Sequence, residues 1–437
     1  MQKLGFIKFR AKHLIYAQLF WVCTSLFFIT EIGLPSSLIY ATDIITCFLF
    51  LLTVLARVKV LKTVEFNYVD VIFILFLIYA LFTSTVNGVN FFSVAWACRT
   101  TFRFYIFYYC CIALLGRKDV STLLRMLEVL FAVNAVLVIF EYFVQGLKGD
   151  YLGGMFGIQQ GANGFMNFYV IVMLSYEISR YLKKDQRLSV LAYYLAVSFI
   201  IASLAEIKFL YIEIIVLVAC ALIMHFPTRK TACLFLVACC LLFLGLQVLK
   251  SVFPSSYTML LSGEGTSDYL DAAWTGGCEM GRTTAIQFIN SSFFSSRTIY
   301  ESYNIGSGNF LINQLFGFGF GAAEPSSLVH SRFADQYSST QYAAFEFADR
   351  YLELGWIGLC LYVLFFLVIF VSTFDKRTHD IESDIWFGAI RLLIPLVLMN
   401  VWYGNFRIDA SYMIFFFLAI PRIASKRPIT SLSEEKL

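Results

Sequence analysis

The sequence predicts an all-α protein that crosses a membrane many times and carries one large polar loop. Hydrophobic residues make up 59% of the 437 residues and charged residues only 14%, whereas soluble domains carry about 25% charged residues. The mean hydropathy is +0.74. The chain also contains about twelve apolar stretches close to the length of about 20 residues that a helix needs to span a bilayer.

Each apolar stretch is expected to form one transmembrane helix. The expected spans are 14–31, 38–56, 68–86, 94–115, 123–145, 164–181, 188–205, 208–226, 231–250, 351–373, 385–404 and 408–424. The first has no small-residue cleavage site, so we expect it to be retained. The expected organisation is helices one to nine in residues 1–250, an outer loop or cap in 251–350, and helices ten to twelve with an inner tail in 351–437.

The distribution of basic residues predicts the orientation. If the N-terminus is cytoplasmic, most of the 33 Lys and Arg fall in inner loops or at the inner ends of spans. The outer connections at 32–37 and 87–93 contain none. Both termini are therefore expected to be cytoplasmic, and the net charge of +4 reflects topology and does not indicate nucleic acid as a partner.

The polar segment at about 250–350 is expected to be folded, because aromatic side chains are abundant and disordered segments have few. A short helix is expected at 282–290, and 341–350 is expected to lead helically into the tenth span. All cysteines except Cys278 fall within or beside spans, where a thiol behaves as a small hydrophobic group. No metal-ligand spacing is present, so we expect neither a metal nor a cofactor.

Ionisable residues within spans are functional candidates because they are costly to bury in lipid. They are Asp43, Arg99, Arg103, Glu206, Lys208, Glu213, Arg391 and Asp409. Arg99 and Arg103 lie four residues apart, on one helical face. The alternative for this pair is snorkelling to the interface beside a partner carboxylate, and for Lys208 it is a simple ion pair with Glu206.

Several cations are expected on the outer side of the membrane. Besides Arg99, Arg103 and Lys208, the outer segment supplies Arg282, with Arg297, Arg332 and Arg350 as further members. Arginine binds phosphate oxygens through paired hydrogen bonds, and lysine acts as a point charge. Together with nearby aromatic residues, these cations suggest a lipid-diphosphate-linked saccharide as substrate.

Five segments in order resemble one family, the bacterial O-antigen polymerases and ligases, which are Wzy-type membrane glycosyltransferases. The resemblance covers about 150–360. It is carried by Gly154-Met155-Phe156-Gly157 with Ala162-Asn163, by Ala205-Glu206-Ile207-Lys208 with lysine in place of the family's arginine, by Arg282, by the glycine run Leu315–Gly321, and by the E-x-G-x-x-G at Glu353–Gly358.

The resemblance implies a GT-C-like fold in the bacterial inner membrane, with the cap in the periplasm. It also implies a repeat-unit polymerase for O-antigen, capsule or exopolysaccharide. Such an enzyme transfers a growing glycan from undecaprenyl diphosphate to the non-reducing end of a second lipid-linked repeat unit. A chain-length regulator and a flippase are the implied protein partners.

Site roles follow from this implied reaction. Arg282 and Lys208 are expected to stabilise the leaving diphosphate, and Arg99, Arg103, Asn163, Arg297, Arg332 and Arg350 to bind substrate. Candidates for a general base are Glu346, Asp349, Glu353 and His330. The three carboxylates share one helical face, and the alternative for them is pairing with Arg350 or helix capping.

Three other functions remain open. A ligase of this group has a histidine about nine residues before the glutamate of E-x-G-x-x-G, but that position here is Ala344, which favours polymerase. A flippase or transporter of the lipid-linked oligosaccharide is expected to place its cations near the midplane and to need no large cap. A non-catalytic scaffold in an assembly complex is the last alternative.

Overall fold

The computed structural model describes residues 2–57, 66–225, 228–271, 280–303, 305–326, 329, 331–374 and 380–425, without the side chains of 2–10, 56–57 and 264. Every regular element in these ranges is a helix. Eight helical segments of the described chain are long and apolar enough to cross a membrane. They are Ala11–Thr30, Ser36–Leu55, Tyr68–Val86, Arg117–Phe143, Lys208–His225, Arg229–Val252, Glu346–Ser372 and Ile381–Tyr403. The protein is thus a polytopic helical membrane protein.

All twelve segments expected to span the membrane are helical. The helices are α1 (Gln2–Thr30), α2 (Ala41–Arg57), α3 (Tyr68–Val86), α4 (Phe91–Leu114), α5 (Arg117–Phe143), α6 (Ala162–Leu182), α7 (Leu188–Leu204), α8 (Lys208–His225), α9 (Arg229–Val252), α16 (Glu346–Ser372), α17 (Ile381–Tyr403) and α18 (Ser411–Ala424).

Four of these twelve helices fall outside the eight that qualify as spans. Helices α7 and α18 have only 17 and 14 residues, while α4 and α6 are long enough but less apolar. Most residues of α6 and α18 are buried. A helix enclosed by other helices contacts little lipid, so the bilayer does not require it to be uniformly apolar. The expected count of twelve spans and the GT-C-like arrangement go beyond what these eight helices establish.

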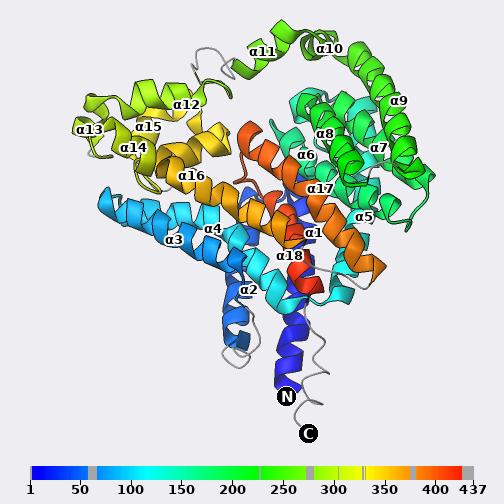
Figure 1. Cartoon of the computed structure of the whole chain (residues 1–437), viewed down its shortest axis with the longest axis horizontal. Helices are drawn as coiled ribbons and strands as arrows, with labels where there is room; N and C mark the ends of the chain where they lie inside the picture. The colour runs from blue at the N-terminus through cyan, green and yellow to red at the C-terminus, as the bar shows by residue number, and fades with distance from the viewer. Residues whose placement is uncertain are drawn as a thin grey trace.

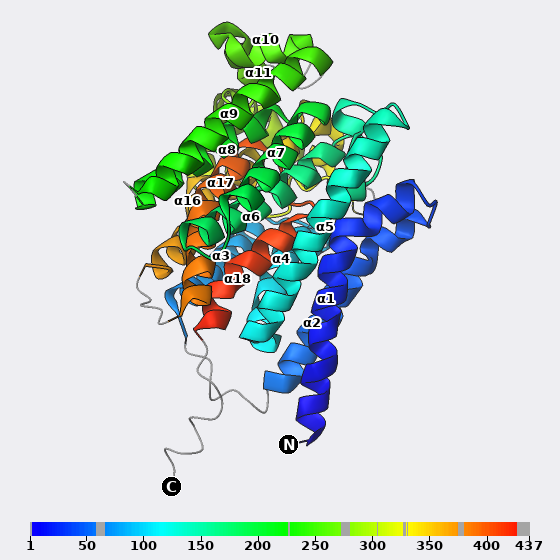
Figure 2. The same cartoon turned by 90° about the vertical axis from the view of Figure 1, so that its right-hand side faces the viewer.

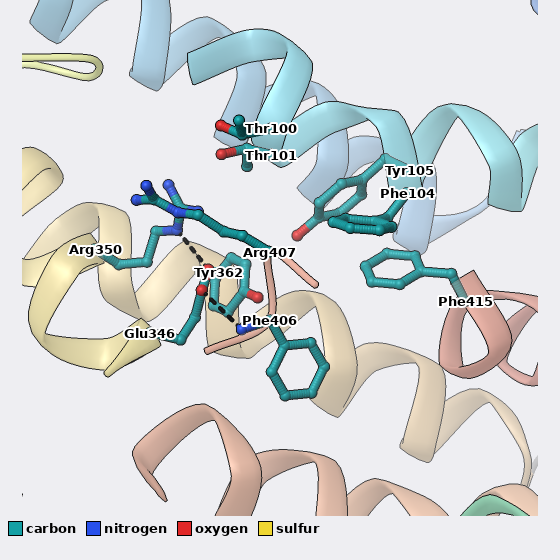
Figure 3. A pocket seen from close by; sticks show the side chains of 10 residues that line it. All are labelled: Thr100, Thr101, Phe104, Tyr105, Glu346, Arg350, Tyr362, Phe406, Arg407 and Phe415. Atoms are coloured by element: carbon teal, nitrogen blue, oxygen red, sulfur yellow. Dashed lines mark hydrogen bonds and ion pairs between the residues drawn. The ribbon is translucent and has the colours of Figure 1, made fainter. Parts of the chain in front are cut away.

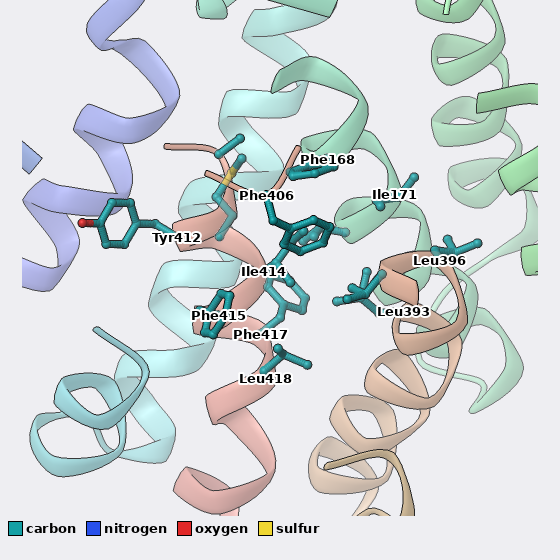
Figure 4. Packing of buried hydrophobic residues seen from close by; sticks show 14 of the residues in the cluster. Phe168, Ile171, Leu393, Leu396, Phe406, Tyr412, Ile414, Phe415, Phe417 and Leu418 are labelled. Atoms are coloured by element: carbon teal, nitrogen blue, oxygen red, sulfur yellow. The ribbon is translucent and has the colours of Figure 1, made fainter. Parts of the chain in front are cut away.

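The helices surround a packed centre made by α6, α17 and α18 (Figure 4). Phe168 and Ile171 of α6 face Leu393 and Leu396 of α17, and Phe417 of α18 packs against Tyr176 of α6. Helix α18 also packs along α4, and α16 packs along α3. The start of α1 and the end of α18 lie at one end of the molecule (Figures 1 and 2).

Short helices form a cap between α9 and α16. They are α10 (Pro254–Leu261), α11 (Gly263–Asp271), α12 (Ala285–Phe288), a π-helical turn (Ile289–Phe294), α13 (Arg297–Tyr303), α14 (Phe310–Phe316), α15 (Arg332–Tyr337) and two 3-10 turns, Ser338–Thr340 and Tyr342–Ala344. Helices α10 and α11 lie at the end opposite the termini (Figures 1 and 2).

Aromatic packing holds the cap together, as its composition predicts. Phe333 lies 5.1 Å from Phe293, 4.9 Å from Tyr337 and 5.7 Å from Phe318, measured between ring centroids. The helix expected at 282–290 is present as α12 and the π-helical turn that follows it. The part of the cap from α12 onward is therefore folded, and it joins the membrane helices at the start of α16.

Candidate functional site

Lys208 and Arg282 lie close to the same aromatic ring, although they are 74 positions apart in the chain. Lys208 is the first residue of α8, and its Nζ lies 5.0 Å from the centroid of the Tyr269 ring on α11. The Cζ atom of Arg282 also lies 5.0 Å from that centroid. We call these three residues, with Glu206 and Tyr403, the Tyr269 site. It lies where the cap meets the membrane helices, and it brings together the two cations that the sequence singled out.

Arg282 is enclosed by aromatic rings. Only 2% of the residue is exposed. Its Cζ atom lies 4.0 Å from the Tyr403 ring centroid and 5.2 Å from that of Phe345, and its Nε donates to the Tyr403 carbonyl oxygen at 3.0 Å. A guanidinium over aromatic faces keeps its charge while losing water. Arg282 is thus a dehydrated cation held in place from α17 and the cap.

Glu206 holds Lys208 and links the membrane helices to the cap. Its Oε1 atom lies 3.0 Å from Lys208 Nζ and accepts a hydrogen bond from Ser256 Oγ on α10. Glu206 sits in the tight connection between α7 and α8 with φ = 55°. Residues other than glycine rarely adopt this conformation, and such strain is concentrated at functional sites.

Asn163 lies next to the Tyr269 site at the start of α6. Its side-chain amide donates to Asp150 Oδ1 at 2.6 Å and to the Ala205 carbonyl oxygen at 3.2 Å, one residue before Glu206. Asn163 therefore fixes the backbone that presents Glu206 and Lys208.

The glycine run packs against an interruption in α16. Gly355 has φ = 64° inside the helix, and a Cβ atom there would lie 2.4 Å from the Leu315 carbonyl carbon. Likewise, a Cβ atom added at Gly317 would lie 2.3 Å from the Glu353 carbonyl carbon. The amides of Phe318 and Gly319 donate to the carbonyl oxygens of residues 352 and 353, each at 2.9 Å. The glycine run and the E-x-G-x-x-G are thus two halves of one backbone contact.

Glu353 secures the end of the glycine run. Its Oε1 atom accepts from the Gly321 amide at 3.0 Å and the Ala323 amide at 3.2 Å. The side chain is fully buried. Glu353 therefore has a structural role, because its carboxylate satisfies two buried backbone donors.

The other two acidic base candidates, Glu346 and Asp349, belong to a buried ion network, of which Figure 3 shows Glu346, Arg350 and Arg407. Arg350 Nε donates to Glu346 Oε1 at 2.7 Å, as the i, i+4 spacing predicts. Asp349 pairs with Arg407, which also lies 2.7 Å from Glu324 Oε2. All of these acids are at most 3% exposed, so none reaches the outer surface of this conformation.

A small cavity adjoins this network, lined by Thr100, Thr101, Phe104, Tyr105, Glu346, Arg350, Tyr362, Phe406, Arg407 and Phe415 (Figure 3). The space open to the centre of a water molecule is about 10 Å³, roughly the room that one water needs. The cavity therefore has room for a water but not for a sugar.

Arg99 and Arg103 contact carboxylates of neighbouring helices. Arg99 pairs with Asp43 on α2. Arg103 Nη1 lies 3.1 Å from Asp43 Oδ1 and 2.9 Å from Asp409 Oδ1, and its Nη2 donates to the Arg407 carbonyl oxygen at 2.7 Å. The structure thus identifies Asp43 and Asp409 as the counter-ions and places this pair in a network apart from Lys208.

The remaining site candidates lie elsewhere or are not described. Arg297 has an 88% exposed side chain and pairs with Glu301 one turn later at 2.7 Å. Arg332 is exposed at the first position of α15. His330 lies outside the described residues. Arg350 belongs to the buried network, away from any open surface.

Sequence reasoning missed Arg407, Glu324 and the aromatic partners Tyr269 and Tyr403. Of these four residues, only Arg407 stands out in the sequence, because it is a cation in the short connection between two apolar segments. The segment from Tyr403, the last residue of α17, to Arg407 joins the two regions: Tyr403 covers Arg282, while Arg407 binds Asp349. Aromatic residues in an aromatic-rich chain give no comparable signal.

The described residues contain no cluster of three or more His, Cys, Asp or Glu side chains that is arranged to hold a metal ion. Cations and aromatic rings are the groups that the Tyr269 site offers to a ligand. Comparison of the sequence with models of protein families found no match, and comparison with curated proteins found none either.

Proposed function

We propose that this protein is a polysaccharide repeat-unit polymerase of the Wzy type, acting on undecaprenyl-diphosphate-linked glycans at the periplasmic face of the bacterial inner membrane. The proposal includes twelve spans with both termini cytoplasmic. It rests on the residues that resemble this family and on the arrangement of the Tyr269 site.

The observation that carries the proposal is that two cations, Lys208 and Arg282, each lie 5.0 Å from the centroid of the Tyr269 ring. Lys208 comes from a candidate span and Arg282 from the cap, so both cations lie at the junction where a lipid diphosphate would bind. The rings that cover Arg282 would open to admit the diphosphate. The ring faces of Tyr269, Tyr403 and Phe345 suit the apolar faces of sugars. A lipid diphosphate would replace the Glu206 carboxylate as the anion beside Lys208.

The proposed reaction requires this site to stabilise a leaving group. A hydroxyl of the acceptor repeat unit attacks the anomeric carbon of the growing glycan, and the bond to the diphosphate oxygen breaks. Negative charge develops on the diphosphate, where Arg282 and Lys208 are placed to neutralise it in a site with little water. The proton of the hydroxyl passes to a base to which we assign no residue. Glu346, Asp349 and Glu353 are engaged by arginines or by the backbone of the glycine run, and His330 lies outside the described residues.

Alanine substitution tests this assignment, with a matched control in the same cap. Arg282→Ala and Lys208→Ala are expected to reduce long-chain polysaccharide by about 10²-fold or more, the usual cost of losing one transition-state contact. Arg297→Ala removes an exposed cation from the same cap and is expected to leave polymer length unchanged. Each variant is compared at equal abundance in the membrane. Normal chains from both site variants would contradict the proposed diphosphate site.

Deletion of the protein separates polymerase from the alternatives. Loss of a polymerase leaves single repeat units on the cell surface. Loss of a ligase leaves long chains on the carrier lipid, and loss of a flippase leaves no exported glycan. Either of the last two phenotypes would contradict the polymerase assignment.

A further inference from the structure

The cap helix α14 presents an apolar face that no described part of the protein covers. Within Phe310–Phe316, Leu311 is 65% exposed, Ile312 45% and Leu315 45%. Phe310 is 39% exposed on the same short helix. The whole stretch 305–323 contains no Asp, Glu, Lys or Arg. A contiguous apolar face of this kind is unusual on a water-exposed surface and marks a contact surface.

The depth of α14 relative to α3 indicates what covers this face. Tyr79 Oη donates to the Leu315 carbonyl oxygen at 3.2 Å, and the Tyr79 ring stacks on Phe316 at 6.4 Å between centroids. Tyr79 lies seven residues before the end of α3 at Val86, which corresponds to about 10 Å along the helix. Since α3 is a candidate span, the end of α14 lies below the outer end of that span.

The apolar face of α14 continues the lipid-facing surface of its neighbours. On α3, Leu75 and Phe82 lie one turn before and after Tyr79 and are 46% and 53% exposed. On α16, Trp356 is 40% exposed next to Gly355, and Trp is common where a span meets the interface. Exposed side chains of spanning helices contact acyl chains, so the adjoining face of α14 meets the same environment.

We propose that α14 is embedded in the outer leaflet, with Leu311, Ile312 and Leu315 against lipid acyl chains. The cap then has its own anchor in the bilayer. The segment that follows α14 fits this placement, since residues 317–323 are irregular but buried. Irregular backbone is tolerated at membrane depth only where protein or a cavity surrounds it. Lipid contact through α14 thus holds the glycine run against the interruption in α16.

Spin labelling of the full chain in phospholipid vesicles tests the proposal. A nitroxide is attached through a genetically encoded ketone amino acid at Ile312, so the eleven native cysteines stay in place. Relaxation is measured with oxygen, which concentrates in lipid, and with a nickel chelate, which stays in water. Ile78 of α3, 58% exposed, is the lipid control. Glu301 of α13, with a 59% exposed side chain, is the water control.

We expect the label at residue 312 to match the one at 78, with high oxygen and low nickel accessibility. High nickel accessibility, as expected at 301, would place α14 in water and overturn the proposal. Low accessibility to both reagents would also overturn it, because a protein surface or a second copy of the chain would then cover the helix.

Discussion

At the scale of single residues, the candidate site residues identified from the sequence have different contacts in the structure. Lys208 and Arg282 meet at Tyr269, and Asn163 supports them. The three acidic base candidates do not join that site. They pair with arginines or hold the glycine run. Residue type and spacing in the sequence therefore identify which charged groups are candidates. The contacts of each group in the structure decide whether it is available to a ligand or has a structural role.

Glu206→Gln tests whether this carboxylate competes with the substrate for Lys208. Glutamine keeps the shape but loses the charge that pairs with Lys208 at 3.0 Å. We expect tighter binding of undecaprenyl diphosphate by the purified protein, on the order of ten-fold if the lost competition amounts to about 1.4 kcal/mol. Unchanged or weaker binding would contradict this role. Lys208→Gln is the paired variant and is expected to weaken binding.

Glu353→Ala is expected to destabilise the fold strongly. The amides of Gly321 and Ala323 lose their acceptor in a buried position, and each unsatisfied donor costs about 1–3 kcal/mol. Glu353→Gln keeps an oxygen acceptor and is expected to retain most of the stability. Thermal unfolding of both variants in detergent measures the difference, and equal midpoints would show that the hydrogen bonds to the glycine run contribute little.

At the scale of elements, the interruption of α16 determines how the cap meets the membrane helices. The helix is interrupted at Gly355 because the backbone of residues 315–317 approaches it too closely for a side chain. The sequence marks this contact only as two glycine patterns far apart in the chain. Neither pattern indicates the other as its partner, since their proximity is a product of folding.

Gly355→Ala is expected to disrupt this contact. The new Cβ would lie 2.4 Å from Leu315, and φ = 64° is strained for alanine, so we expect a loss of roughly 2–5 kcal/mol from strain and overpacking together. Gly164→Ala is the matched control, because it lies in α6 with nothing within 4 Å of the added Cβ. It should be neutral or stabilising. Similar unfolding midpoints for the two variants would contradict the close contact.

At the scale of the whole molecule, twelve largely apolar helices and one cap make the architecture of the described chain. The start of α1 and the end of α18 lie at the same end (Figures 1 and 2), which fits an even number of crossings. Eight helices of the described chain have the length and composition of spans. The other four helices miss these criteria for two reasons: α7 and α18 are short, whereas α4 and α6 are less apolar.

Reporter fusions test the twelve-span topology. Green fluorescent protein fused to either terminus is expected to fluoresce, because it folds in the cytoplasm. Alkaline phosphatase fused after Ser295 in the cap is expected to be active, because its disulfides form only in the periplasm. An inactive phosphatase at that position, or a non-fluorescent fusion at either terminus, would require a different number or orientation of spans.

The sequence by itself determined the helical membrane fold and the position of the cap along the chain, and it marked Lys208 and Arg282 as candidates. These follow from local properties: a bilayer selects apolar helices of fixed length, and isolated charges stand out in such a chain. Only the tertiary structure decided which charges meet, since Arg407, Asp349 and Glu324 are distant in sequence and converge through packing. Contacts between remote segments depend on how helices pack around one another, which no local pattern encodes.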